Sequence, residues 1–338
     1  MVIDNIILRN EPLFLAPMED ITDPSFRSLC KDFGADVMYT EFISSDGLIR
    51  DGAKSVKKLK ISDSERPIGI QLYGHIIESM VGAAKIAESA HPDLIDINFG
   101  CPVKKIANRG AGSGMMRDIL LMVKMTKAIV DAVKIPVTVK TRLGWDDNSK
   151  NIVEVAERLQ DTGIKGITIH GRTKSQMYKG EADWTLIGEV RNNPRMTIPV
   201  IGNGDIDSPV KAKEMFDRYG VDGIMIGRAS VGRPWLFRNI RNYLDTGDLL
   251  PEPGLSEKVD LARLHFERSL EYKTGSRSIF EIRRHFSNYF KGLPDFKKTR
   301  LKLLTSTDPD EILNLLEYIR KRWNDFAPSI QSKGIYGI

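Results

Sequence analysis

One cysteine stands in a setting that could carry out chemistry. Cys101 lies in the stretch Asn-Phe-Gly-Cys-Pro at 98–102, directly after an apolar run that predicts a strand. Gly100 and Pro102 favour a tight turn that leaves the thiol free to face a cleft. A thiol with an ordinary pKa of about 8.5 is mostly protonated at neutral pH, so it can act as a general acid. Cys30, within a stretch typical of a helix, instead fits a small buried hydrophobe.

Other reactive side chains follow the ends of further apolar runs. These runs predict eight strands, at residues 13–15, 37–39, 68–70, 94–97, 137–139, 166–169, 200–201 and 223–226. Nearly every residue at such an end can hydrogen bond or titrate, which favours a shared functional site. The residues are Ala16, Pro17, Met18, Glu41, Gln71, Asn98, Lys140, Arg142, His170, Asn203, Gly204, Asp205, Gly227 and Arg228.

The elements between these runs predict how the residues are brought together. Amphipathic stretches typical of helices separate the strands, among them residues 76–90, 119–133, 152–162 and 209–219. Continuous apolar strands alternating with helices indicate a parallel sheet covered by helices. Eight such units favour a closed (β/α)8 TIM barrel over an open doubly wound sheet. In that fold the active site lies at the carboxyl ends of the strands, so the side chains should meet at one mouth.

Several rim residues suit a phosphorylated, electron-rich ligand, and each has a simpler interpretation. The glycine-containing turns after the last two strands could bind phosphate together with Arg228, or could merely be tight turns. Lys140 could face a flavin ring or could pair with a rim acid such as Glu41 or Asp96. Gln71 could contact the flavin's pyrimidine edge or could cap a strand end. His170 could contact flavin or substrate, although a lone histidine at such a position is more often structural. The glycine-rich stretch at 109–114 could be a mobile lid or a plain turn.

A second, helical domain follows the barrel. Gly and Pro residues between 245 and 256 break the pattern, and four helical stretches follow at 257–272, 278–291, 296–304 and 308–323. We therefore expect a barrel domain at 1–243, a linker at 244–256 and a helical domain at 257–338.

The charge of the chain is concentrated in this helical part. The whole chain carries +5, whereas residues 268–302 hold ten cations and three anions, a net +7. Such a block can bind a polyanion such as nucleic acid, although a solvated helical surface has the same composition. The candidate contacts are Arg283, Arg284, Lys297, Lys298 and Arg300.

Composition excludes several other classes of protein. The hydrophobic content of 41% is ordinary for a globular chain, and the two cysteines cannot form a disulfide framework. No His/Cys cluster has zinc spacing, so we expect no metal. No apolar run approaches the roughly 20 residues of a membrane helix, and the first residues lack the basic region of a signal peptide. We expect a cytoplasmic monomer that does not act at a membrane.

These motifs, taken in order, resemble the tRNA-dihydrouridine synthase family, most closely its bacterial B type. The resemblance rests on Ala-Pro-Met at 16–18, Gln-Leu-Tyr-Gly at 71–74, Gly-Cys-Pro at 100–102, Lys-Thr-Arg at 140–142, His-Gly-Arg-Thr at 170–173, Asn-Gly-Asp at 203–205 and Gly-Arg at 227–228. Phe99 departs from the smaller or sulfur-bearing residues usual there. The resemblance covers the whole barrel, and the helical tail fits the family's second domain.

The resemblance implies FMN as prosthetic group, with NADPH or NADH as electron donor. It implies that the D-loop region of tRNA is the substrate, with hydride passing from FMN to C6 of a uridine and a proton from Cys101 to C5. Asn98, Arg142 and His170 would lie near flavin or uracil. The implied cofactor contacts are Ala16, Pro17, Met18, Gln71, Lys140, His170, Asn203, Gly204, Asp205, Gly227 and Arg228. Two alternatives stay open: a flavin enzyme acting on a free pyrimidine, as dihydroorotate dehydrogenases do, and an RNA-binding protein that has lost catalysis.

Overall fold

The computed structural model describes residues 1–272 and 277–324. These form two compact units. The first comprises Met1–Ser230 and Pro234–Leu250, and the second comprises Val231–Arg233 and the described residues from 251 onward. Lys273 of the basic block, and the part of the expected helical domain beyond residue 324, lie outside the described residues.

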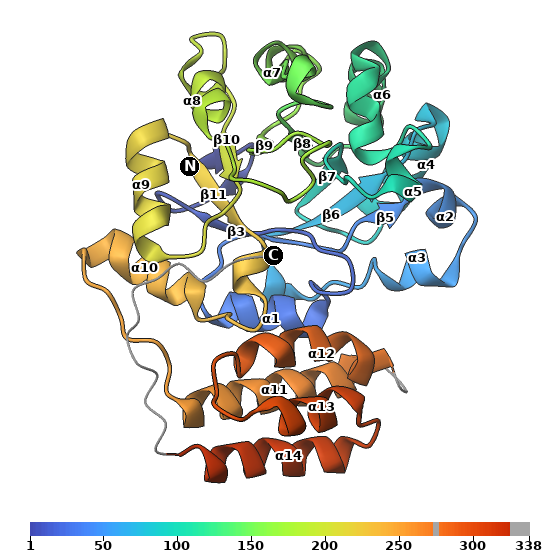
Figure 1. Cartoon of the computed structure of the whole chain (residues 1–338). Helices are drawn as coiled ribbons and strands as arrows, with labels where there is room; N and C mark the ends of the chain where they lie inside the picture. The colour runs from blue at the N-terminus through green and yellow to red at the C-terminus, as the bar shows by residue number, and fades with distance from the viewer. Residues whose placement is uncertain (273–276, 325–338) are drawn as a thin grey trace. The chain divides into compact units, whose positions relative to one another are not determined.

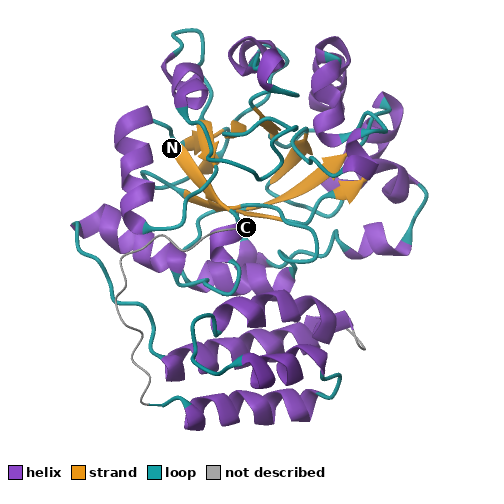
Figure 2. Ribbon diagram, in the orientation of Figure 1, coloured by secondary structure: helices purple, strands orange, loops and turns teal. Residues whose placement is uncertain are grey.

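The first unit is a (β/α)8 barrel, which confirms the fold expected from the apolar runs (Figures 1 and 2). Its parallel strands follow one another in the ring order β3-β11-β10-β9-β8-β7-β6-β4. A parallel bridge between Phe14 and Val37 joins the first strand to the second at the closure. The strands are β3 (Leu13–Leu15), β4 (Met38–Tyr39), β6 (Ile68–Tyr73), β7 (Leu94–Asn98), β8 (Val137–Arg142), β9 (Ile167–His170), β10 (Val200–Asn203) and β11 (Gly223–Ile226).

β6 and β8 each run three residues further than expected, so Gln71 and Lys140 lie within strands rather than at their ends. The short β5 (Ile43–Ser44) pairs with Leu72 and Tyr73 and thereby prolongs β6. Pairing of Arg142 with His170 of β9 prolongs β8 in the same way. The cause in both cases is a partner strand, which a single run of apolar residues does not reveal.

Helices cover the outside of this ring, and their ends follow local sequence signals. Asp23 caps α1 by accepting from the backbone of Phe26, with Pro24 in the first turn. Ser208 caps α9 in the same manner, and Gly220 ends it with a φ of +64°. The helices are α1 (Pro24–Asp32), α2 (Ser45–Ile49), α3 (Ala53–Lys57), α4 (Ile77–Glu88), α5 (Lys104–Ala107), α6 (Ile119–Ala132), α7 (Ile152–Gln160), α8 (Thr185–Asn192), α9 (Pro209–Tyr219) and α10 (Leu236–Thr246).

An N-terminal hairpin packs into the interior of the barrel. It pairs β1 (Val2–Ile3) with β2 (Ile6–Ile7), and Ile3 and Ile6 join an apolar cluster with Phe14, Leu94 and Ile201. Leu94 is the first residue of β7, so this cluster fills the interior towards the amino-terminal ends of the strands. Polar residues of the interior are therefore concentrated towards the carboxyl ends.

The second unit consists of helices, as the sequence predicted for this part of the chain. They are α11 (Leu255–Tyr272), α12 (Arg277–Tyr289), α13 (Lys297–Thr305) and α14 (Pro309–Arg322). Because α10 ends at Thr246 and α11 begins at Leu255, the irregular segment is shorter than the linker expected at 244–256. In the described part of the chain, none of the helices has both the length and the apolarity to cross a membrane.

Candidate active site

Strand pairing brings the expected rim residues next to one another. Asn98 of β7 pairs with Lys140 of β8, and Arg142 of β8 pairs with His170 of β9. His170 pairs in turn with Asn203 of β10. Five residues from four strands thus occupy neighbouring positions at the mouth of the barrel.

The turn that carries Cys101 is held from several sides. Asn98 Oδ1 accepts hydrogen bonds from the backbone N–H groups of Gly100 (3.0 Å) and Cys101 (2.9 Å). Arg142 Nε donates to the carbonyl of Gly100 at 2.7 Å. Ser113 donates to the Cys101 carbonyl from both its backbone N–H (3.1 Å) and its hydroxyl (2.8 Å). The glycine-rich stretch at 109–114 therefore braces this turn, with residues from Gly112 onward forming the short helix η2 (Gly112–Arg117).

The thiol itself is buried, which keeps it protonated. Only 7% of Cys101 is exposed. Burial raises the pKa of the Cys101 thiol, while the backbone N–H of Val103 and the nearby charges of Arg142 and Lys140 act in the opposite direction. The side chain is thus an S–H group at neutral pH, with the positive charges of Arg142 and Lys140 near its sulfur.

Buried amides connect this turn to the barrel interior. Asn98 Nδ2 donates to Gln71 Oε1 at 2.8 Å, and Gln71 Nε2 donates to Asp96 Oδ2 at 2.6 Å. Thr138 donates to the other Asp96 oxygen at 2.6 Å. Burial raises the pKa of Asp96 from 3.8 to about 6, against the hydrogen bonds from Gln71 and Thr138. Sequence reasoning considered Asp96 only as a partner for Lys140.

Lys140 is a partly buried cation held by a neutral amide. Its Nζ donates to Asn203 Oδ1 at 3.1 Å, and Asn203 Nδ2 donates to the carbonyl of Met225 at 2.8 Å. Among the described residues, Lys140 forms no ion pair with Glu41, with Asp96 or with any other acid. Burial, reinforced by Arg142, lowers the pKa of Lys140 from 10.5 to about 8.

The loops after β9, β10 and β11 meet at the carboxylate of Asp205. Arg172 is buried and donates to both Asp205 oxygens at 2.9 and 2.7 Å. The N–H of Ala182 (2.8 Å) and Arg228 Nη2 (3.2 Å) donate to the same carboxylate. Gly204, with a φ of +131°, lies where an added Cβ would come within 2.6 Å of Ala182. Only glycine therefore fits the turn that precedes Asp205.

Arg142 and an aromatic residue that sequence reasoning missed also organise this side. Arg142 Nη1 donates to the carbonyls of Thr173 (3.0 Å) and Met177 (2.8 Å), which fixes the start of the loop after β9. The Tyr178 ring lies 4.7 Å from the guanidinium carbon of Arg228 and 5.6 Å from that of Arg142. The ring centroids of His170 and Tyr178 are 6.4 Å apart. Half-exposed Tyr178 thus offers an aromatic face beside the strand-end histidine, and the tyrosine that follows the His-Gly-Arg-Thr motif could have signalled it.

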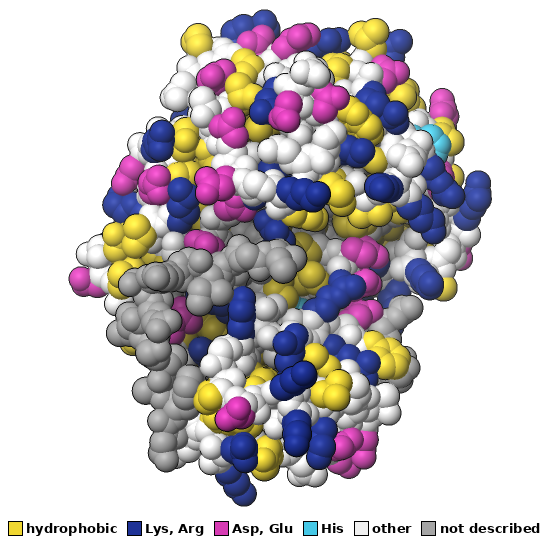
Figure 3. Space-filling model, in the orientation of Figure 1, with side chains coloured by type: hydrophobic (Ala, Val, Ile, Leu, Met, Phe, Trp, Pro, Cys, Tyr) yellow, Lys and Arg dark blue, Asp and Glu magenta, His cyan; other side chains and the backbone are white. Residues whose placement is uncertain are grey.

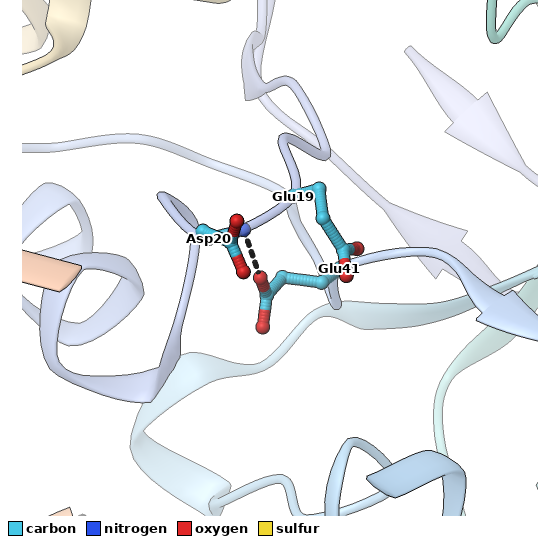
Figure 4. Close-up of side chains that lie close together, drawn as sticks. All are labelled: Glu19, Asp20 and Glu41. Atoms are coloured by element: carbon cyan, nitrogen blue, oxygen red, sulfur yellow. Dashed lines mark hydrogen bonds between the residues drawn. The ribbon is translucent and has the colours of Figure 1, made fainter. Parts of the chain in front are cut away.

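The opposite side of the rim carries acids. Carboxylate oxygens of Glu19, Asp20 and Glu41 lie within 4.8 Å of one another (Figure 4). The backbone N–H of Asp20 donates to Glu41 at 2.5 Å, and Lys58 pairs with Glu19 at 2.6 Å. Burial raises the pKa of Glu41 from 4.5 to about 7, although Lys58 opposes this. One member of the trio thus already has a cationic partner in Lys58.

The sequence model of dihydrouridine synthase (Dus) matches residues 14–324. A probable tRNA-dihydrouridine synthase of Rickettsia conorii is 41% identical over 308 residues, covering 91% of this chain and 92% of that protein. The tRNA-dihydrouridine synthase B of Pseudomonas putida is 40% identical over 296 residues, or 87% of each chain.

The chain belongs to the dihydrouridine synthase family.

This confirms the family that the motifs resembled, and it makes the chain an oxidoreductase. Solved structures show the same fold at much lower identity. A histamine dehydrogenase from Rhizobium sp. 4-9 aligns with a TM-score of 0.52 at 15% identity, over 77% of this chain and 50% of that one. A 2-naphthoyl-CoA reductase aligns with a TM-score of 0.55 at 12% identity, over 72% and 51%. The present chain thus spans about half the length of either of these two proteins.

In the helical unit the candidate polyanion contacts divide into two kinds. Arg283 Nη2 donates to the carbonyls of Thr305 (3.1 Å) and Ser306 (2.8 Å) at the end of α13, and the Arg283 guanidinium stacks on Phe280. Arg284, Lys297, Lys298 and Arg300 are exposed. Figure 3 shows Lys and Arg side chains spread over the visible face of this unit. Arg283 thus has a structural task, and the exposed cations remain candidates for RNA contact.

Proposed function

We propose that this chain reduces uridines of tRNA to 5,6-dihydrouridine with FMN as prosthetic group, NADPH or NADH as electron donor and Cys101 as proton donor. The observation that carries this proposal is the buried, protonated Cys101 thiol on a braced turn near the partly buried cation Lys140. The proposal rests also on membership of the family and on the names of the curated relatives.

The residues present fit a bound FMN. Lys140 lacks a carboxylate partner in the described chain, and such a partly buried cation suits a ring that gains electrons. Asn203 holds the Lys140 ammonium, and Gly204 forms a turn with no room for a side chain. These residues would hold the cofactor together with Ala16, Pro17, Met18, Gln71, His170, Gly227 and Arg228. Because the Asp205 carboxylate already accepts from Arg172, Ala182 and Arg228, its proposed part is to hold Arg228 in place.

Bound FMN supplies the hydride for C6 of the uracil ring. Cys101 gives the proton that C5 requires, and the resulting thiolate lies near the positive charges of Arg142 and Lys140. Asn98, Arg142 and His170 would orient the base. Burial, together with the neighbouring cations, lowers the pKa of His170 well below 6.5, so this side chain is neutral at physiological pH.

The substrate must reach this site as an exposed base. A stacked uridine cannot enter a barrel mouth, so it must be splayed out of the RNA. Exposed Arg284, Lys297, Lys298 and Arg300 would bind phosphates in the D-loop region of tRNA, which positions the RNA by shape rather than by sequence.

The decisive test is Cys101→Ala. Loss of a general acid typically lowers the rate about 10²–10⁴-fold, so the variant should keep its flavin absorbance but lose most dihydrouridine formation. Single-turnover reoxidation of reduced enzyme by unmodified tRNA measures this directly. Cys30→Ala, which removes the other thiol, is the control and should react at the wild-type rate. Activity of Cys101→Ala within about threefold of wild type, far inside that range, would disprove the assignment.

The same assay separates the alternative functions. Turnover of free uracil without turnover of tRNA would indicate an enzyme acting on a free pyrimidine. A colourless protein that binds tRNA would indicate an RNA-binding protein without catalysis.

A further inference from the structure

A chain of polar side chains runs from the barrel interior to the Cys101 turn. Asp96 accepts from Gln71, Gln71 accepts from Asn98, and Asn98 accepts from the backbone N–H groups of Gly100 and Cys101. The three side chains are almost fully enclosed, with exposures of 1% for Asp96, 0% for Gln71 and 6% for Asn98. Water therefore cannot readily replace a lost link in this chain.

The groups at the two ends of this row of hydrogen-bonded side chains fix the direction in which its hydrogen bonds are donated. The backbone N–H groups of the turn can only donate, so Asn98 must present its oxygen to them. Its nitrogen must then face the Gln71 oxygen, and the Gln71 nitrogen must face residue 96. An ionised carboxylate only accepts, so Asp96 suits this end and excludes the reversed arrangement.

The carboxylate is itself fixed in place. Thr138 donates to the Asp96 oxygen that Gln71 does not use. Both Asp96 and Thr138 lie on neighbouring strands and pair directly in the sheet. Asp96, the first side chain of this hydrogen-bonded row, thus lies in the rigid barrel wall rather than in a loop.

We propose that Asp96 is a positioning residue for Cys101. Its carboxylate sets the direction of the Gln71 and Asn98 amides and thereby holds the turn in the conformation that places the thiol. The importance of this placement for catalysis rests on the proposed function of Cys101, whereas the placement itself can be measured without catalysis.

The test is the rate at which iodoacetamide alkylates Cys101 in the purified enzyme, resolved from Cys30 by mass spectrometry. The thiol is buried, so alkylation requires local opening of the turn. Asp96→Val keeps a residue suited to a strand but removes the acceptor. We expect alkylation to be about tenfold faster, the change that follows when a buried donor loses its partner.

Two further variants make the result specific. Asp96→Asn can still accept from Gln71 with its oxygen while its nitrogen faces the Thr138 hydroxyl, so its alkylation rate should stay within about threefold of wild type. Thr141→Val is the matched control: it removes a buried hydroxyl that has no partner in the described chain and should leave the rate unchanged.

The proposal is overturned if a folded Asp96→Val enzyme is alkylated no faster than wild type, or if Asp96→Asn is alkylated as fast as Asp96→Val. If Asp96→Val does not fold, Gln71→Leu removes the next side chain of the hydrogen-bonded row and must accelerate alkylation of Cys101 equally. An unchanged alkylation rate in Gln71→Leu also overturns the proposal. Because alkylation uses neither tRNA nor nicotinamide, its outcome is independent of whether Cys101→Ala abolishes dihydrouridine formation.

Discussion

The two sides of the barrel mouth carry opposite charges. An acidic arc follows β3, β4 and β7, and a basic arc follows β8, β9 and β11. The acidic arc comprises Glu19, Asp20, Glu41, Asp96 and Cys101, and the basic arc comprises Lys140, Arg142, His170, Arg172 and Arg228. Burial raises the pKa values of Glu41, Asp96 and Cys101 and lowers those of Lys140, Arg142 and His170.

The comparison teaches that burial shifts the pKa values of the two arcs in opposite directions. Desolvation favours the neutral form of every buried titratable group, so burial raises the pKa values of the acids and lowers those of the bases. A pocket of this kind can offer a proton from one side and a positive field from the other. This division of roles is what the proposed proton transfer from Cys101 needs.

Asp205 is the exception, since it is an acid among bases. Burial alone would raise its pKa, but the hydrogen bonds from Arg172 and from the N–H of Ala182 lower the pKa of this carboxyl below its ordinary value. The basic arc therefore depends on one carboxylate that four hydrogen bonds keep ionised, whereas burial raises the pKa values of Glu41 and Asp96 in the acidic arc.

The largest effect should follow from removing that carboxylate. Asp205→Ala leaves Arg172, which is 2% exposed, without its anion. An unpaired buried charge is costly, and we expect the free energy of unfolding to fall by about 3 kcal/mol. Denaturant unfolding of flavin-free protein measures this without a contribution from cofactor binding.

Arg228→Gln is the matched control for this variant. It removes another partner of the same carboxylate, but Arg228 is half exposed, so the loss should be below about 1 kcal/mol. Equal losses for the two variants would show that burial of Arg172 does not distinguish them, and the contrast between the arcs would then fail.

Features of the fold that depend on one segment alone could be predicted from the sequence. Continuous apolar runs predicted the eight barrel strands, because burial on both faces is a property of each strand alone. Gly and Pro signals predicted the helical unit in the same local way. The hairpin formed by β1 and β2 was missed because strands of two residues carry no periodicity.

Partners within the site could not be predicted in this way. The motifs named Cys101, Lys140 and His170, but the contacts of Asp205 with Arg172 and of Gln71 with Asp96 join residues 33 and 25 positions apart. Such pairs depend on which strands and loops become neighbours. Arg283 is a further case: it was predicted as a polyanion contact because it lies in the basic block, but its guanidinium donates hydrogen bonds to carbonyls at the end of α13.

The next largest effect should be on the pH dependence of stability, and it should come from His170. Because the pKa of His170 is well below 6.5 in the folded protein, the unfolded chain binds more protons as the pH falls below 6.5. Stability is therefore lost on acidification. Between pH 6.5 and 5.5 the wild type should lose about 1 kcal/mol relative to His170→Gln, measured as the difference between their denaturation midpoints at each pH. Parallel pH profiles would mean that folding does not lower the pKa of His170.

Glu41 in the acidic arc should give a smaller effect of the opposite sign. Its pKa is raised from 4.5 to about 7, so the folded protein holds a proton that the unfolded chain releases. The stability that this provides is complete below pH 4.5 and is lost as the pH rises through about 7. Glu41 is partly exposed, and solvent reduces the effect to about 0.5 kcal/mol. In denaturant unfolding of flavin-free protein, Glu41→Gln should remove the loss of stability with rising pH, so the profile between pH 5 and 7 rises more steeply. His170→Gln should instead remove the rise on the acid side of 6.5. If both substitutions change the slope in the same direction, the two sides of the mouth do not respond oppositely to protons.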